Sequence, residues 1–187
     1  MPAQAGRRAD AVRNRQLALD AAMALLAGSD TTLTVEAIAS RAGLGAATVV
    51  RAYGGKDALV DAAISRLLEP VVQRARVLLT ETTPYQALRT FLRELIAFQT
   101  SYHGLSDQLD VLDLPATTVL RAGLVAAVEE MSDGARHDGA IRADLDPAVV
   151  GILISQTALA VARTRPPSGD LADAYVTVLL DGLRPRP

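Results

Sequence analysis

The sequence predicts an all-α fold of about nine helices. Ala and Leu, which favour helices, are abundant among the 187 residues, whereas aromatic residues make up only 3%. Apolar residues recur at helical spacing, and no segment shows the sustained apolar–polar alternation of a half-buried strand. Gly and Pro residues divide the chain into segments of helical length.

The first three predicted helices are bounded by local signals. Apolar residues at helical spacing, beginning with Val12, predict a first helix that ends at Gly28. Thr34 can cap a second helix, because its hydroxyl can accept a hydrogen bond from the first turn. Gly43 ends that helix, and a third helix is expected over about residues 46–53.

Six further helices are predicted downstream. A proline inside the first of them, Pro70, should kink it near residues 66–67, because proline removes one hydrogen bond and crowds the preceding turn. The predicted ranges are about 56–79, 85–101, 105–113, 115–138, 147–162 and 170–183.

Composition excludes several classes of protein. The chain has no cysteine, which rules out a disulfide framework, a thiolate nucleophile and a cysteine-ligated zinc site. The first ten residues lack the apolar stretch of a signal peptide, and the longest uncharged run, residues 147–162, is shorter than the roughly 20 residues of a membrane span. We therefore expect a cytoplasmic protein without a membrane segment.

Charge is distributed unevenly along the chain. Residues 1–80 carry ten Lys or Arg and seven Asp or Glu, whereas residues 81–187 carry nine and fourteen. This asymmetry suggests that only the first part meets a polyanion, although scatter around zero would also account for it.

Residues 34–56 have the spacing of a helix-turn-helix. Ala39 is small where two helices would cross, Gly43 can adopt a positive φ in the turn, and Val49 can anchor the second helix. Tyr53 lies one turn after Val49 and should also face inward. The opposite face then carries Ala46, Ala47, Val50 and Arg51. Small side chains on this face would let the helix backbone approach the floor of a major groove.

Two other interpretations fit parts of this segment. An ordinary packing of three short helices needs the same small and apolar residues. Residues 43–48 also approach a dinucleotide-binding fingerprint, but they lack its third glycine and follow a helix instead of a strand. DNA binding is favoured by the hydroxyl and basic side chains nearby, which are the usual phosphate contacts: Thr34, Lys56 and arginines 7, 8, 13 and 15.

Residues 11–80 resemble the TetR family of bacterial repressors. The resemblance rests on the helix lengths and on the string TVEAIASRAGLGAATVVRAYGGKDAL, in which an aromatic, a short turn, a lysine and an acidic residue follow the third helix. It implies a helix-turn-helix domain over residues 1–56, with the fourth helix packing against it to about residue 66, and a second domain over 57–187. The DNA contacts that it implies are Thr34, Ala46, Ala47, Thr48, Val50, Arg51 and Lys56.

Two positions depart from the family pattern. The family commonly has Tyr where this chain has Val50, and His or Tyr where it has Ala52. A missing tyrosine removes a phosphate contact, so phosphate binding here should depend more on Arg51, Lys56 and the N-terminal arginines. Arg51 is also a candidate for reading a guanine directly.

The second half resembles the family only in its architecture, a helical bundle for dimerisation and ligand binding. The helix over 147–162 is apolar around its whole circumference, and the one over 170–183 has a wide apolar face. Either they are fully internal, or a second copy covers them, as the resemblance implies with a four-helix interface. The expected interface residues are Ile152, Gln156, Leu159, Tyr175, Leu179 and Leu183.

The resemblance also implies a small, mostly apolar effector. Such sites are apolar cavities with a few polar groups. The candidates, each of which is more often a core residue than a ligand contact, are Phe91, Leu95, Phe98, Gln99, Tyr102, His103, Leu124 and Gln156.

These observations predict a ligand-responsive regulator, most simply a repressor that binds a palindromic operator as a homodimer and needs no metal or cofactor. The alternative is a dimeric helical-bundle enzyme that does not bind DNA. Its carboxylates would be Asp107, Asp110 and Asp113, which fall along one helical face. Metal sites in helical bundles normally add a Glu-x-x-His element, which this chain lacks, so a solvated acidic face accounts better for these residues.

Overall fold

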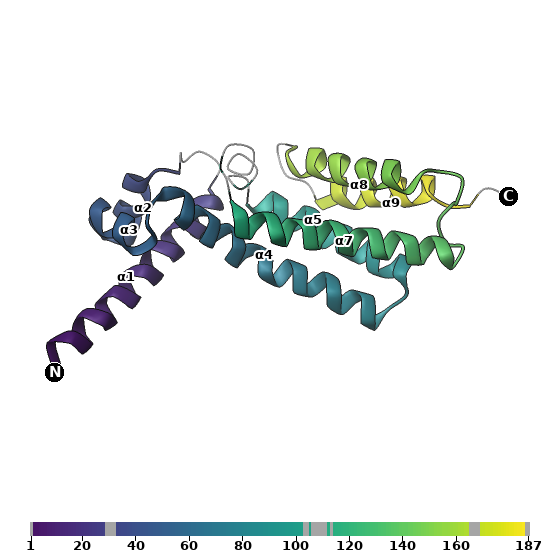
Figure 1. Cartoon of the computed structure of the whole chain (residues 1–187). Coiled ribbons are helices and arrows are strands. Elements are labelled where there is room, and N and C mark those ends of the chain that lie inside the picture. Colours follow the sequence, from purple (N-terminus) through teal and green to yellow (C-terminus); the bar gives the residue numbers. More distant parts are fainter. Residues whose placement is uncertain are drawn as a thin grey trace. The chain divides into compact units, whose positions relative to one another are not determined.

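The computed structural model describes residues 2–28, 33–102, 105, 112, 114–164 and 169–185. Within these residues the chain forms eight α-helices and no strand, which confirms the all-α prediction (Figure 1). The predicted helix over 105–113 lies almost entirely outside them. The helices are α1 (Pro2–Leu26), α2 (Val35–Ala42), α3 (Ala46–Tyr53), α4 (Lys56–Glu81), α5 (Pro84–Ser101), α7 (Pro115–His137), α8 (Pro147–Ala162) and α9 (Gly169–Gly182).

Local signals in the sequence account for several helix ends. The Thr34 hydroxyl accepts a hydrogen bond from the Ala37 N–H at 3.1 Å and so caps α2. The Asp146 carboxylate accepts one from the Ala148 N–H at 2.8 Å and caps α8. Proline is the first residue of α5, α7 and α8, where its missing N–H costs nothing.

The apolar side of α1 differs from the prediction. Val12 was expected on this side, but it is 71% exposed. The reason is that only the C-terminal part of α1 packs against other helices, whereas its first half extends beyond them. The buried residues of α1 are Ala18, Ala21, Ala22, Leu25 and Leu26.

The chain divides into two compact units. Unit 1 consists of Met1–Leu68 and Tyr102–Val119, and unit 2 of Glu69–Ser101 and Leu120–Pro187. Both α4 and α7 therefore contribute to each unit, and α4 passes from one to the other directly before Pro70. The domain boundary at residues 56–57 stays a prediction, as does the kink near residues 66–67.

A carboxylate of α4 fastens the start of α7 within unit 1. Asp61 accepts hydrogen bonds from the Ala116 N–H at 3.1 Å, the Thr117 N–H at 2.8 Å and the Thr117 hydroxyl at 2.7 Å. Partial burial alone would raise the pKa of Asp61, but the Thr117 and Ala116 hydrogen bonds together bring it below its usual value. The two N–H groups belong to the first turn of α7, so Asp61 caps α7 from another helix. Thr117 is only 1% exposed, so this acceptor replaces water at a buried position.

The core of unit 2 lies between α5, α7, α8, α9 and the second half of α4. Its largest fully buried side chain is Phe91 of α5, and α7 reaches it with Met131. Near the end of α7, a Cβ added at Gly134 would lie 2.7 Å from the Pro84 ring, so only glycine allows this close approach. The rest of the buried core is apolar and includes Leu88, Leu92, Ile96, Ile141, Ile154, Val176 and Leu180.

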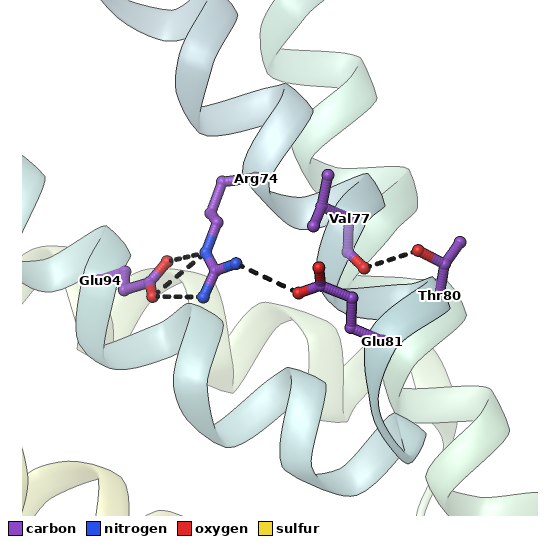
Figure 2. Close-up of polar contacts among 5 residues, drawn as sticks. All are labelled: Arg74, Val77, Thr80, Glu81 and Glu94. Atoms are coloured by element: carbon purple, nitrogen blue, oxygen red, sulfur yellow. Dashed lines mark hydrogen bonds and ion pairs between the residues drawn. The ribbon is translucent and has the colours of Figure 1, made fainter.

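A surface ion pair also joins α4 to α5 in unit 2. The Arg74 guanidinium donates to both carboxylate oxygens of Glu94, at 3.0 Å each for its closest contacts, and lies 3.6 Å from a carboxylate oxygen of Glu81 (Figure 2). These side chains are about half exposed, and solvent and salt screen such pairs, so they contribute little to stability. The apolar core therefore outweighs this pair in holding α4 to α5.

Candidate nucleic-acid interface

The turn between α2 and α3 has the backbone geometry that the sequence predicted for it. Gly43 adopts a left-handed conformation, with φ of 66°. Its N–H donates to the Ser40 carbonyl at 3.3 Å, and the next N–H, that of Leu44, donates to the Ala39 carbonyl at 2.9 Å. This pair of bonds ends α2 and reverses the chain toward α3. Ala39 is 4% exposed, so the small residue does lie in the contact between helices.

The α3 helix has one buried and one exposed side. Val49 is 1% exposed and anchors α3 in the core of unit 1. On the other side Ala47, Val50 and Arg51 are exposed, while Ala46 and Thr48 are half-buried. Apart from Arg51, the exposed side therefore carries only short side chains, which would let the helix backbone approach the floor of a major groove.

The basic and hydroxyl side chains proposed for DNA contact remain accessible. The Arg51 guanidinium lies 3.4 Å from the Thr48 hydroxyl oxygen, one turn earlier on α3. Gly54, with φ of 83°, ends α3, and Lys56 begins α4 after it, half-buried. The Thr34 hydroxyl accepts from Ala37, so its own hydrogen is still able to donate to a phosphate.

Arg15 and Tyr53 join α1 to the C-terminal end of α3, a contact that sequence reasoning missed. The Arg15 guanidinium carbon lies 4.2 Å from the centre of the Tyr53 ring, and its Nη1 donates to the Ala52 carbonyl at 2.9 Å. In return the Tyr53 hydroxyl donates to the Arg15 carbonyl at 3.1 Å. Burial raises the pKa of Tyr53, although Arg15 opposes the shift, so the hydroxyl keeps its proton. Arg15 thus helps to position α3, while its expected phosphate contact stays a prediction.

The proposed effector residues differ in their surroundings. Phe91 is fully buried, and Leu95, Phe98, Gln99 and Leu124 are half-buried in unit 2. The side-chain oxygen of Gln99 is buried and has no hydrogen-bond partner among the described residues.

The other three proposed effector residues have different surroundings or lie outside the described residues. Tyr102 is half-buried but belongs to unit 1, and His103 lies outside the described residues. Gln156, which was proposed for both the effector site and the dimer interface, is exposed on α8.

The outer side of α8 and α9 is apolar and exposed. On α8, Val149, Ile152 and Leu153 are 49%, 61% and 48% exposed, and on α9 Leu171 and Val178 are 38% and 72% exposed. The opposite sides of both helices pack on the core of unit 2 (Figure 1). The outer apolar face, as we call these five residues, therefore lies on one side of the α8–α9 layer.

The interface residues expected from sequence divide into three groups. Ile152 and Gln156 are exposed, Leu159, Tyr175 and Leu179 are half-buried, and Leu183 is 5% exposed in the core of its own chain. The Tyr175 hydroxyl lies 2.8 Å from that of Thr157, a bond that joins α9 to α8 within one chain. The sequence did not distinguish the outer side because α8 is apolar all around.

Nothing in the described part of the chain assembles a metal site. No three side chains of His, Cys, Asp or Glu lie together there. The aspartates of the enzyme alternative, at positions 107, 110 and 113, lie outside the described residues.

Comparison with known proteins identifies the class. Residues 18–63 match the model for bacterial regulatory proteins of the TetR family, and residues 83–185 match that for the C-terminal domain of SbtR-like transcriptional regulators. A helix-turn-helix joined to this helical domain defines a DNA-binding transcriptional regulator. The chain belongs to the TetR family, which fits a regulator and not the enzyme alternative.

Solved structures agree with this assignment. A TetR transcription regulatory protein from Mycobacterium vanbaalenii is 34% identical, with 95% of this chain and 98% of that chain covered and a TM-score of 0.61. The regulator SCO0520 from Streptomyces coelicolor is 27% identical, with 92% and 99% covered and a TM-score of 0.64. FadR from Bacillus subtilis, solved in complex with stearoyl-CoA, shares the fold at 16% identity, with 90% and 99% covered and a TM-score of 0.71.

Two other findings complete the comparison. No curated protein matches the chain in sequence. Across the part of the chain that the structure describes, no helix is both long and apolar enough to cross a membrane.

Proposed function

We propose that this regulator is a cytoplasmic repressor that binds an inverted-repeat operator as a homodimer and is released by a small, mostly apolar effector. The observation that carries the DNA-binding part is α3, which presents small residues and one arginine on its exposed side. A two-fold dimer offers two such helices to half-sites on successive major grooves.

Arg51 and Lys56 should contribute to operator binding in different ways. Arg51 projects from the groove-facing side of α3, so its guanidinium is placed to read a base edge. Lys56 lies at the start of α4, beyond the end of α3, where it is placed to neutralise a phosphate.

We expect Arg51→Ala to weaken operator binding by about 1–3 kcal/mol and to relax the preference at one base pair of each half-site. Lys56→Ala should weaken binding to all sequences alike and reduce its salt dependence, because a phosphate contact carries no sequence information. Fluorescence anisotropy with the operator and with single-base variants at several salt concentrations measures both effects. Equal affinity of wild type and both variants would refute this assignment of α3.

The outer apolar face of α8 and α9 supplies the proposed dimer interface. Large apolar side chains that are 38–72% exposed on neighbouring helices are costly in an isolated chain, and a second copy would remove them from water. Because the two-fold axis would pass near this face, each α8–α9 pair would meet the same pair of the partner and form four helices.

The effector site is proposed around α5 in unit 2. Leu95, Phe98 and Leu124 are half-buried apolar side chains, and the buried Gln99 oxygen requires a donor that no described residue supplies. An apolar molecule with one hydrogen-bond donor fits these groups. To act as an inducer it must prefer the conformation that binds DNA poorly.

We expect Leu124→Arg to abolish the response to the effector while leaving operator affinity unchanged. A charged side chain would occupy an apolar site that DNA binding does not need. A long-chain alcohol, which combines an apolar chain like that of the stearoyl-CoA in the FadR structure with one hydroxyl donor, is a suitable first probe. Release of operator is the readout, and Val125→Arg, an exposed neighbour, is the control. A Leu124→Arg protein that any active probe still releases from operator would contradict this location.

A further inference from the structure

The first half of α1 forms a helical arm that projects from the helix-turn-helix. Residues 8–13 are all exposed, including Val12 at 71%, although the helix is continuous from Pro2 to Leu26. Figure 1 shows these first turns extending clear of α2 and α3. A solvated helical extension contributes nothing to the core, so its conformation and its side chains are available for another task.

The arm has a defined direction relative to α3. Arg15 marks its base, because its guanidinium lies on the Tyr53 ring at the C-terminal end of α3. Arg8 is seven residues earlier and therefore lies on the same side of α1, about two turns or roughly 10 Å further out. Arg8 therefore lies beyond the contact that Arg15 makes with the end of α3.

We propose that the arm binds the DNA that flanks each half-site, with Arg8 contacting a phosphate beyond the base pairs that α3 reads. This inference rests on the proposed function, because it takes α3 as the helix in the groove. A reach of roughly 10 Å corresponds to about three base pairs along a strand. Charge complementarity favours a polyanion, since residues 2–14 carry three arginines and one aspartate.

Arg13 provides a matched control on the same arm. It is exposed like Arg8, but it lies on the opposite side of α1 from Arg8 and Arg15. Replacing either arginine removes one charge from the same helix, so the two variants differ only in the direction of the lost side chain.

The experiment uses the full chain and an operator in two lengths, one ending at the half-sites and one extended by about six base pairs, twice the reach of the arm. We expect wild type and Arg13→Ala to bind the long duplex roughly tenfold more tightly than the short one. Arg8→Ala should bind both duplexes with equal affinity. On the long duplex, the slope of its log binding constant against log salt concentration should be smaller in magnitude than that of wild type by about 2, because each protomer loses one phosphate contact. Thermal unfolding checks that both variants fold as wild type does.

Three results would overturn the arm's role. In the first, Arg8→Ala keeps the preference for the long duplex. In the second, Arg8→Ala lowers the affinity for both duplexes by the same factor. In the third, Arg13→Ala loses the preference for the long duplex in the same way as Arg8→Ala. All three leave operator selection by the wild-type protein intact, so they are distinguishable from a failure of the proposed function, in which wild type selects no operator.

Discussion

Ile152→Asp should convert the protein into a folded monomer that binds its operator at least about a hundredfold more weakly. Ile152 is 61% exposed in the single chain, so an aspartate there is solvated and the fold of the monomer is retained. In the proposed dimer each protomer would bury one such aspartate in the interface, and an unpaired buried charge costs several kcal/mol. Operator affinity falls because two monomers must then bind the two half-sites separately, without the effective concentration that the dimer provides for the second binding event.

Matched valines separate this effect from a general effect of added charge. Val178→Asp on α9 should also give a monomer, because Val178 is 72% exposed on the outer apolar face. Val125→Asp on α7, at 55% exposure, should leave the dimer intact, since this valine lies outside that face. Light scattering at micromolar concentration measures the result. A wild-type monomer, or an Ile152→Asp dimer of unchanged affinity, would contradict the α8–α9 interface.

Asp61→Ala should destabilise the protein by about 2–3 kcal/mol, because hydrogen bonds to a charged acceptor are lost around a buried residue. The Thr117 N–H and hydroxyl would then lose this acceptor at a position that is only 1% exposed. Asp57→Ala is the matched control in the same helix, since Asp57 is exposed, and it should cost less than about 1 kcal/mol. Chemical denaturation of both variants measures the difference, and equal costs would refute the capping role.

The same contact predicts a pH dependence. The pKa of Asp61 is lower in the folded chain than the roughly 3.9 of an unfolded aspartate, so its stabilisation is fully present above that pH. The stabilisation is lost as the pH falls through the lower, folded pKa. The stability difference between wild type and Asp61→Ala should therefore stay constant above about pH 4 and shrink as the pH falls below it.

Much of the fold could be predicted because its signals are local. Thr34 as a cap, Gly43 as the turn and the prolines at the starts of α7 and α8 act on residues within one helical turn. The spacing from Ala39 to Val49 then fixed which side of α3 is buried. For this reason the helix-turn-helix, including the buried side of α3, was recognisable before the structure.

The remaining features depend on contacts between distant residues. Arg15 and Tyr53 are 38 positions apart, and Asp61 and Thr117 are 56 apart. In the sequence an arginine or aspartate on a helix resembles any solvated charge. Likewise, a wide apolar face such as that of α9 does not show which part of it packs inward. Leu183, directly after α9, was therefore expected at an interface although it lies in its own core.

Selection of bound DNA from a random-sequence pool, with the full chain at physiological salt, tests the central claim most directly. The account predicts enrichment of an inverted repeat whose half-site centres are about one helical turn or a multiple of it apart, bound with two-fold protein symmetry. Enrichment of no sequence, or of a single half-site bound by one chain, would contradict it.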